Sequence, residues 1–477
     1  MARVAGSRPA AGRRHAEPAH DNLREGLETE TLNRTEALVE RDAKVLSDTL
    51  KVRFFPLAIE RAEGCRIWDV EGREYLDFMA GWAVANTGYG NQAIKRAVIE
   101  QMDKVSFMTL TALMNEPSIE LAEQLLEVIP GRGERKVWFG LSGSDASDAV
   151  AKLVPLAQKR PRMVSYIGGY HGQTGGSAGL SGHTAQSRVM SGNVVKVPYP
   201  NPYRCPLGHD DPGVCGKACL SYLEDYVFRT ICPPQDVAGL IVEAVQSDGG
   251  DIVPPDGYLE AVQALCRKHG ILFILDEVKI GFGRTGKMWG YQHSGLEPDV
   301  VVLGKSMGSG FAGISGVVAP AAVLDVAPAI NMYTTAGNPV ATRAGLATLE
   351  YIESHKLVEN AKRIGDRLLH GFQDLQKRHE LIGDARGRGM ILGVELVRDR
   401  KTKEPAAKEA AKVVYRAYEL GLIVFYGGIY SNVLEITPPL TMTPDEADRG
   451  LEILDRALTD VESGSFPDEK LGRYAGW

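Results

Sequence analysis

Five apolar segments separated by helical patterns constrain the fold of this chain more than any other feature. Each segment is apolar on both faces, which is typical of buried parallel strands and not of strands with one solvated face. Helices between such strands cover both faces of the sheet, so the pattern predicts an α/β domain with a mostly parallel sheet. The segments are "KVWFGL" from Lys136, "MVSYIG" from Met163, "VAGLIVEAV" from Val237, "ILFILDE" from Ile271 and "DVVVLG" from Asp299.

The pattern changes on either side of this domain. Before it, a helix is predicted at about 27–48, and "CRIWDVEGREYLDFM" predicts a hairpin that turns at Glu71 and Gly72. After about Asn338, two helices at 341–353 and 357–378 lead into short strands and a final helix from Pro444, a smaller α+β domain. We therefore expect a disordered basic tail at 1–25, an N-terminal segment at 26–85 that packs with the small domain, a large domain at 86–338 and the small domain at 339–477.

Composition excludes several classes of protein. With 477 residues, 44% hydrophobic and 24% charged, the chain is typical of a globular protein of two or three domains. A net charge of −7 argues against a nucleic-acid partner, and no apolar run is long enough to span a membrane. The N-terminus "MARVAGSRPAAGRRHAEPAH" has no apolar segment of the secretory type, so we expect a cytoplasmic protein.

An irregular insertion, "YRCPLGHDDPGVCGKAC", contains Cys205, His209, Cys215 and Cys219. These residue types could bind zinc, but their spacing fits no common zinc site, and we expect a loop with unpaired thiols and no metal. The sequence gives the insertion no role.

Four short stretches carry residues suited to chemistry, and they follow one another along the α/β domain. Asp276 ends an apolar strand, where α/β sheets bind ligands. Lys305, in "VVVLGKSMGSG", follows a later strand among glycines, and apolar surroundings lower the pKa of an amine. The remaining candidates are the turn "LSGSDA" with Ser142 and Ser144, which opens a helix and suits a phosphate, and "GGYHGQ" with Tyr170 and His171, which could stack on a flat ring.

Each stretch also has an ordinary structural explanation. Asp276 could cap a helix or form a buried ion pair, and Lys305 could extend its amine from a strand end into solvent. The serine turn could be a common helix start, and Tyr170 a surface aromatic residue. Taken singly, none of these stretches identifies a function.

Together and in this order, the four stretches resemble the class III aminotransferases, pyridoxal-phosphate (PLP) enzymes of fold type I. The family pattern has a serine-glycine turn before a helix, a Tyr-His-Gly loop, Asp-Glu-Val at a strand end and Gly-Lys after a later strand. The resemblance extends from about residue 40 to the C-terminus. It implies a large domain with a mostly parallel seven-stranded sheet and a smaller α+β domain.

The resemblance also implies roles for individual residues. Lys305 would form the Schiff base with PLP, and Asp276 would keep the pyridine nitrogen protonated, so that the ring accepts electrons from the substrate α-carbon. Val278 would pack against the ring face opposite Tyr170. Further residues expected at the cofactor are Ser142, Gly143 and Ser144 near the phosphate, His171, Glu243 near substrate and cofactor, and Thr334, which would reach the phosphate of a neighbouring subunit. The last match implies a homodimer with shared sites, or a tetramer.

Lys279 raises a separate question, because it follows Asp-Glu-Val directly in "DEVKIG". In many family members a glutamine there hydrogen-bonds the phenolic oxygen of the cofactor, and a lysine could donate to the same oxygen. The alternative is that Lys279 pairs with a nearby carboxylate and does not meet the cofactor.

Several stretches resemble one branch in particular, α-amino-ε-caprolactam racemase and its transaminase-like neighbours. They include "YHGQTGGSAGLSGH", "QSDGGDIVPPDG" and "SNVLEITPPL". Within them, Glu435 takes a position where many class III transaminases have a carboxylate-binding arginine, so amines, amino-acid amides or lactams become plausible donors. Asp248 matches the proposed second acid/base of the racemase, and Trp82 matches a tryptophan of its substrate pocket.

Two reactions follow from these matches. Transamination needs one base, Lys305, to move a proton between the α-carbon and the cofactor, whereas racemisation needs proton exchange on both faces, by Lys305 and Asp248. Asp248 could also be an ordinary turn residue, and Trp82 could simply pack in the core. We expect a transaminase that moves an amino group from an amine or amino-acid derivative to a keto acid such as pyruvate, with racemisation of amides or lactams as the alternative.

Overall fold

The computed structural model of the protein describes residues 33–183 and 193–474. The predicted basic tail and the start of the predicted helix at 27–48 lie outside the described residues. Within them, helix α1 covers Arg34–Val45 and has a capping box built from Asn33 and Glu36.

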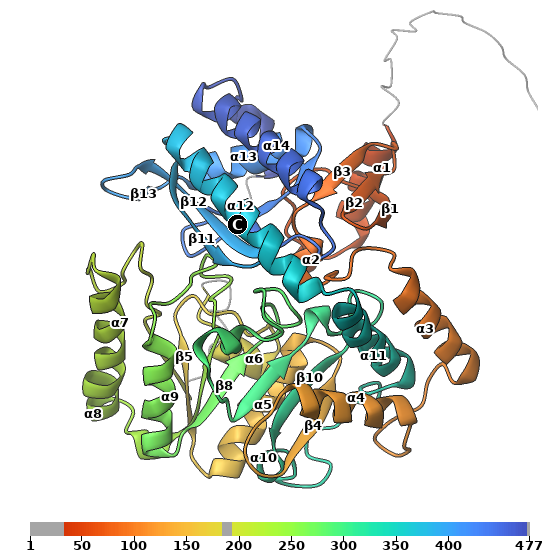
Figure 1. Ribbon diagram of the computed structural model, residues 1–477, viewed down its shortest axis with the longest axis vertical. Coiled ribbons are helices and arrows are strands. Elements are labelled where there is room, and N and C mark those ends of the chain that lie inside the picture. The colour runs from red at the N-terminus through yellow and green to blue at the C-terminus, as the bar shows by residue number, and fades with distance from the viewer. Residues whose placement is uncertain (1–32, 184–192, 475–477) are drawn as a thin grey trace, which may run out of the picture.

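The centre of the molecule is a seven-stranded sheet, which forms the lower half of Figure 1. Strand β10 is antiparallel to both of its neighbours, β4 and β9, and the other neighbouring pairs are parallel. The expected mostly parallel sheet is thereby confirmed. Its order is β4 (Arg135–Gly140), β10 (Ser315–Pro320), β9 (Val300–Leu303), β8 (Leu272–Asp276), β7 (Val237–Val242), β5 (Arg162–Tyr166) and β6 (Val194–Val197).

Two of these strands, β6 and β10, are missing from the five that the sequence predicted. Strand β6 is a four-residue edge strand with a lysine, and the apolar stretch of β10 is a short one among glycines. The sequence of neither segment indicates a strand. Each becomes a strand by pairing with neighbours that are distant along the chain.

Alternating side chains of the central strands pack on opposite faces of the sheet. On one face, Ile274, Val300 and Val302 pack with helix α5 (Gly143–Gln158). On the other, Phe273, Val301 and Leu303 join the larger core, which includes helices α4 (Glu116–Val128), α9 (Tyr258–His269) and α11 (Pro339–Ser354). The strands are therefore covered on both sides, as expected from their composition.

The C-terminal elements, blue in Figure 1, lie above the large sheet. Helices α12 (Leu357–Arg378), α13 (Ala407–Glu419) and α14 (Pro444–Glu462) pack with an antiparallel sheet of β11 (Ile382–Arg388), β12 (Ile391–Asp399), β16 (Val433–Ile436) and β15 (Phe425–Gly427). Strand β13 (Glu404–Pro405) pairs with β12. Helix α12 has the bounds that the sequence predicted.

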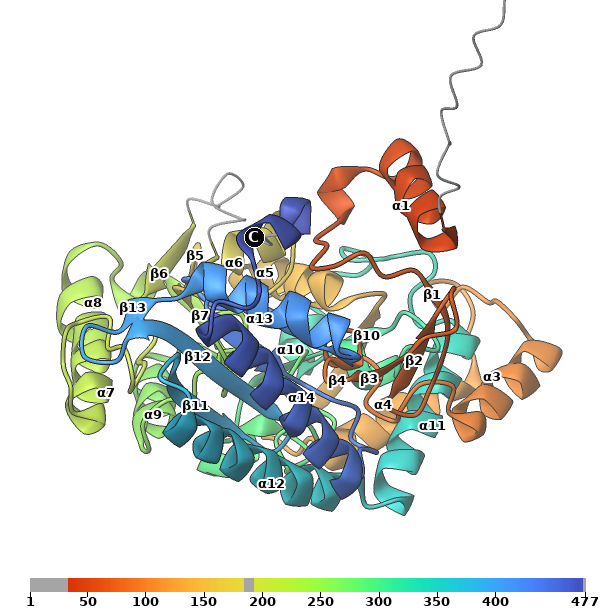
Figure 2. The same cartoon turned by 90° about the horizontal axis from the view of Figure 1, so that it is seen from above.

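The N-terminal strands join this C-terminal region. Strands β1 (Ile59–Glu63), β2 (Arg66–Asp69) and β3 (Glu74–Asp77) are antiparallel, and β2 and β3 form the predicted hairpin. Strand β14 (Leu422–Ile423) then pairs with β3 in parallel. In Figure 2, α1 stands apart from the body beside these strands, while helix α3 (Gln92–Lys104) lies against α11. The division at 86 and 338 stays a prediction.

The cysteine-bearing insertion is more regular than expected. Its second half is helix α7 (Pro212–Ser221), capped by Asp211, which continues through a π-helical turn (Tyr222–Val227) into α8 (Phe228–Thr230). Cys215 and Cys219 lie one turn apart and are buried, while His209 is exposed. Among the described residues no group of three or more His, Cys, Asp or Glu side chains could hold a metal ion. The same part of the chain contains no helix long and apolar enough to cross a membrane.

Candidate active site

Lys305 and Asp276 come together at the carboxyl ends of two neighbouring strands. Strands β8 and β9 are parallel, and Asp276 pairs with Val302, three residues before Lys305. Lys305 has a left-handed backbone with φ of 40°, a strained conformation for a side chain of this size. No described residue hydrogen-bonds to its amine. Burial, and next the charge of Lys279, lower the pKa of Lys305, which favours the neutral, nucleophilic amine.

A histidine orients Asp276. His171 Nδ1 lies 2.6 Å from Asp276 Oδ2, and the backbone N–H of Val278 donates to Asp276 Oδ1 at 2.9 Å. Both side chains are almost fully buried, and His171 Nε2 has no partner among the described residues. The carboxylate therefore has a fixed direction, and its remaining lone pairs can accept a further N–H.

The turn before α5 offers free backbone donors. Ser142 caps the helix, because its Oγ accepts from Asp145 N–H while Asp145 accepts from the Ser142 backbone. The N–H groups of Gly143 and Ser144, at the first two helical positions, have no described acceptor. Such a helix start binds anions well. The Ser142 hydroxyl is used as the cap, so the free donors belong to the backbone.

Two of the predicted residues, Gly143 and Val278, touch at this turn, together with Gly304. A Cβ atom at Gly143 would lie 2.6 Å from Val278 Cγ1, and one at Gly304 would lie 3.0 Å from Gly143 Cα. Glycine at 143 and 304 thus allows the helix start, the residue before Lys305 and Val278 to approach one another. The phosphate-type donors and the lysine amine consequently belong to one site.

The Tyr170 loop is held by Glu243. Glu243 follows β7 and accepts from the Tyr170 backbone N–H at 3.3 Å and from the Ser247 hydroxyl at 2.7 Å. Burial raises the pKa of Glu243 to about 7, and the nearby charge of Asp276 adds to the shift. Burial and the charge of Asp248 raise the pKa of the Tyr170 hydroxyl. Glu243 therefore connects the tyrosine loop with the loop that carries Asp248.

Lys279 points to carboxylates. Its Nζ lies 2.8 Å from Glu435 Oε1 and 3.9 Å from Asp248 Oδ1. The side chains of Lys279 and Glu435 are nearly fully buried, and that of Asp248 is partly exposed. The contact with Glu435 is close but poorly aligned, because neither Lys279 Nζ nor Glu435 Oε1 makes a hydrogen bond of ordinary geometry. Burial opposes ionisation, but the charges of Glu435, Asp251 and Asp248 raise the pKa of Lys279 above its usual value, so the amine is charged. The arrangement matches the alternative in which Lys279 meets a carboxylate.

Trp82 lies beside this group on an unusual turn. The four residues of α2 (Ala80–Ala83) all have φ between 47° and 65°, a left-handed turn that costs about 1–2 kcal/mol for each residue other than glycine. Asp77 accepts from the backbone N–H groups of Met79 and Ala80 at the start of the turn. Ser306 donates to the Ala83 carbonyl at its end. Trp82 packs on Phe425 with 4.8 Å between ring centroids, and Lys279 Nζ lies 5.9 Å from its ring.

Thr334 stands away from these residues. Its side chain is exposed, and its carbonyl accepts from Thr109 at 3.0 Å. Its predicted contact with a neighbouring subunit stays a prediction.

The structure adds residues that the sequence did not single out. Asp251 is buried, and neither of its carboxylate oxygens has a hydrogen-bond partner among the described residues. Arg386 of β11 donates to the carbonyl of Gly250, and Arg284 is fully buried against carbonyl groups and Asn86. The stretch "SDGGD" contains Asp251, but nothing in it separates this carboxylate from an ordinary turn residue.

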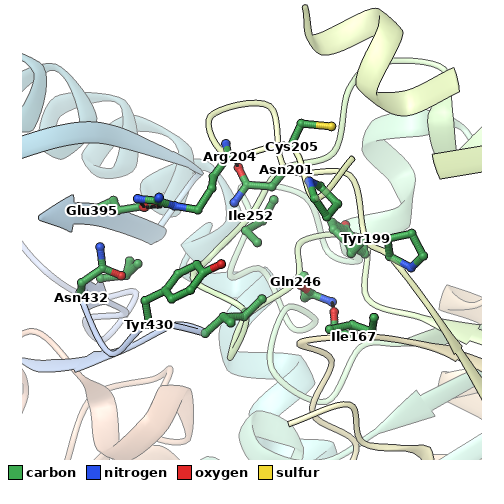
Figure 3. A pocket seen from close by; sticks show the side chains of 15 residues that line it. Ile167, Tyr199, Asn201, Arg204, Cys205, Gln246, Ile252, Glu395, Tyr430 and Asn432 are labelled. Atoms are coloured by element: carbon green, nitrogen blue, oxygen red, sulfur yellow. Dashed lines mark hydrogen bonds and ion pairs between the residues drawn. The ribbon is translucent and has the colours of Figure 1, made fainter. Parts of the chain in front are cut away.

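A separate cavity of about 220 Å³ is lined in part by Gln246, Gly249 and Ile252, from the loop that carries Asp248 and Asp251. Figure 3 shows Arg204 and Glu395 on one side of this cavity and Gln246 with Ile167 on the other. Arg204 pairs with Glu395 at 2.7 Å. Lys305, Asp276 and Lys279 are not among the residues that line it, so it is distinct from the candidate active site.

These residues fit PLP. The site offers an amine without a partner, free backbone donors at a helix start for a phosphate, and a histidine-oriented carboxylate at a strand end for a pyridine N–H. The fold and these groups together define a pyridoxal-phosphate enzyme of fold type I.

Comparison with known proteins agrees with this class. The family model described as "Aminotransferase class-III" matches residues 49–458. A leucine/methionine racemase of Thermococcus litoralis is 39% identical, over 93% of this chain and 100% of its own. A 5-aminovalerate aminotransferase of Pseudomonas aeruginosa is 38% identical, over 85% of this chain and 94% of its own. An amine transaminase from an uncultivated Pseudomonas species, solved in its PLP-bound form, superimposes with a TM-score of 0.80 at 30% identity and covers 84% of this chain and 94% of its own.

The chain belongs to the class III aminotransferase family. The expected family, fold type, enzyme class and PLP cofactor are confirmed. Relatives of similar identity include both aminotransferases and racemases, in line with the mixed resemblance found in the sequence.

Proposed function

We propose that the protein transfers an amino group from an amine or amino-acid derivative to a keto acid such as pyruvate. The observation that supports this proposal best is the amine of Lys305, which has no described hydrogen-bond partner and lies near Asp276 at the carboxyl ends of β8 and β9. When bound, PLP supplies an aldehyde that condenses with amines and a ring that stabilises negative charge at the substrate α-carbon.

The chain's own groups would then act as follows. The N–H groups of Gly143 and Ser144 would bind the phosphate, and Val278 and Tyr170 would pack on the ring. Asp276, oriented by His171, would accept the pyridine N–H. Lys305 would hold the cofactor and, as an amine of lowered pKa, would take and return the proton of the substrate α-carbon.

The donor class follows from the charges around Lys279. Glu435 already pairs with Lys279 at 2.8 Å, and Asp248 lies 3.9 Å from the same amine. A substrate carboxylate at this place would have to compete with two carboxylates for one cation. Donors that carry an amide or no acid group suit this pocket better, and Trp82 and Phe425 give it an apolar wall.

Racemisation is the second candidate, and two observations favour it. Asp248 lies beside Lys279 and acts electrostatically on Lys305, so a second proton-exchanging group is close to the reacting centre. Several relatives, the leucine/methionine racemase among them, are named as racemases or epimerases. In this reaction Lys305 would serve one face of the α-carbon and Asp248 the other.

One experiment separates the two reactions. The holoenzyme is incubated with one enantiomer of an amino-acid amide or of α-amino-ε-caprolactam, first without and then with pyruvate. Formation of alanine without loss of optical rotation in the first incubation supports amino-group transfer. Loss of optical rotation without any keto acid, and no alanine with pyruvate, would refute it in favour of racemisation. Asp248→Asn should lower racemisation at least tenfold more than amino-group transfer.

The covalent role of Lys305 has its own test. Lys305→Ala should abolish the visible band of the cofactor linked covalently to the lysine, whereas Lys279→Ala should only shift this band. The reverse outcome would make Lys279 the covalent residue and overturn the assignment.

We further propose a homodimer in the cytoplasm. The exposed Thr334 matches a residue that reaches a neighbouring phosphate, which supports sites shared between subunits. Light scattering of the holoenzyme gives the oligomeric state, and Thr334→Ala should weaken cofactor binding; a monomer with full cofactor affinity would contradict the proposal.

A further inference from the structure

Asp251 is buried where the loop after β7 packs against strand β12. The loop from Gln246 to Ile252 closes on itself through two backbone hydrogen bonds between these residues, and Asp251 within it has φ of 50°. Strand β12 packs directly on this loop, because a Cβ atom at Gly393 would lie 2.9 Å from the Gly250 carbonyl oxygen and 3.1 Å from Asp251 Cβ. The glycine at 393 therefore leaves the space that Asp251 occupies.

Gly393 contacts Asp251 and pairs with Glu435 in the sheet, so Asp251 lies near Glu435. Across the antiparallel sheet, Arg386, Gly393, Glu435 and Phe425 form one row of paired residues on β11, β12, β16 and β15. Paired residues of a sheet project to the same face. Asp251 thus lies against the face of the sheet that carries Glu435, the ion-pair partner of Lys279.

The charged groups around Asp251 do not balance. Facing it are Glu435 of β16, Lys279 and Arg284 from the loop after β8, Arg386 of β11, and Asp248 of its own loop; β12 contributes the uncharged Gly393. The arginines are committed elsewhere: Arg386 donates to the Gly250 carbonyl, Asp384 and Glu395, and Arg284 to two carbonyls and Asn86. Lys279 is then one cation facing three carboxyl groups.

Four buried polar atoms of these acidic and lysine side chains lack a hydrogen-bond partner within the described part of the chain. Asp251 Oδ1 and Oδ2, Lys279 Nζ and Glu435 Oε1 are all buried without a hydrogen-bond partner among the described residues. An ionised carboxylate in that condition is costly, whereas a carboxylic acid carries no charge to desolvate. Asp248 is partly exposed and Glu435 has the lysine at 2.8 Å, whereas Asp251 is buried and forms no ion pair with a described residue.

We propose that Asp251 is a positioning residue that holds a proton in the resting enzyme and thereby leaves Glu435 as the ion-pair partner of Lys279. As a neutral acid, Asp251 fills the space under Gly393 without competing for the lysine. Were it ionised, it would draw the amine of Lys279 away from Glu435 and from the reacting end of the site. Burial, followed by the charge of Glu435, raises the pKa of Asp251 well above its usual range, in agreement with this geometry.

The expected signature is a dependence of stability on pH. Because the pKa of Asp251 is higher in the folded than in the unfolded chain, the wild-type protein loses stability as pH rises through the folded-state value. Asp251→Asn keeps the shape of the acid but cannot ionise, so its unfolding midpoint relative to wild type should rise with pH. We expect the difference to grow by about 2 °C or more between pH 6 and pH 9. Asp256→Asn, an exposed carboxylate five residues on, is the matched control and should show no such trend.

Thermal unfolding of the holoenzyme and of both variants over this pH range tests the inference. Asp251→Ala is a second variant for the same test. Its smaller side chain lowers the unfolding midpoint at every pH, but the difference between its midpoint and that of wild type should shift with pH in the same direction as for Asp251→Asn. A constant difference for both variants, or a difference that becomes more negative as pH rises, would overturn the proposal, because Asp251 would then be ionised and stabilised by Lys279. The inference rests on the proposed site, but the test reads stability and not turnover, so it fails or succeeds independently of the reaction assigned above.

Discussion

Replacing Gly143 by alanine is the most direct test of the proposed phosphate site. The added Cβ would lie 2.6 Å from Val278 Cγ1 and 3.2 Å from Cγ2, whereas carbon atoms pack at about 3.5–4.0 Å. Either the start of α5 or Val278 must move by about 1 Å. Overpacking of this kind costs about 1–3 kcal/mol.

The free-energy cost of this overpacking should weaken the binding of PLP. Without cofactor, the strained contact relaxes by displacing the helix start or Val278, and binding then requires both to return to their places. At 1.4 kcal/mol for each factor of ten, the dissociation constant of PLP should rise by about 5- to 150-fold. Titration of the apoenzyme with PLP, followed by visible absorbance, measures it.

Two further variants make the result specific. Gly175→Ala places the same methyl group at the first position of another helix, α6 (Gly175–Leu180), with no atom within 4 Å, and should bind PLP as wild type does. Val278→Ala removes the clashing methyl groups and should restore binding in the Gly143→Ala background, which a double-mutant cycle quantifies. If Gly143→Ala binds PLP within twofold of Gly175→Ala, or if Val278→Ala gives no rescue, the contact does not control the cofactor site.

Three other predictions follow from the buried charges and thiols. Lys279→Ala should destabilise the protein by about 3–5 kcal/mol in urea unfolding, because it leaves the buried Glu435 carboxylate without its cation. Adding Glu435→Gln should recover part of this loss, and a double variant no more stable than Lys279→Ala would contradict the pairing. Glu243 alone should lower wild-type stability by about 3 kcal/mol as pH rises from 5 to 9 through its pKa of about 7, since the folded chain holds that proton more tightly. Glu243→Gln should reduce the pH dependence of the free energy of unfolding by this amount. Dialysis against a chelator should leave the unfolding midpoint unchanged, whereas one zinc ion per chain in the purified protein would restore the metal interpretation of the cysteine insertion.

The sequence predicted long, regular elements well and short or irregular ones poorly. The five apolar strands, the hairpin at Glu71 and Gly72 and helix α12 follow from local composition and periodicity. Strands β6 and β10 depend on their neighbours in the sheet, and the left-handed turn at Ala80–Ala83 depends on anchors such as Asp77 and Ser306. No local preference favours these conformations, so no local sequence pattern predicts them.

The site divides in the same way. The resemblance of four ordered motifs to the class III aminotransferases singled out Lys305, Asp276 and the glycine turn, whereas each motif alone had an ordinary structural explanation. The pairing of Lys279 with Glu435 remained open, since 156 positions separate them in the chain. Asp251 could not be distinguished from the turn residues around it until strand β12 was seen to cover it.

By itself, the sequence determined the fold class, since strand composition is a local property of the chain, and the resemblance of its ordered motifs to a known family implied the family and the cofactor. The tertiary structure alone decided which charges meet: one lysine among three carboxyl groups, under a strand whose glycine leaves them room. Electrostatic free energies depend on distance and burial, and neither is set by position along the chain.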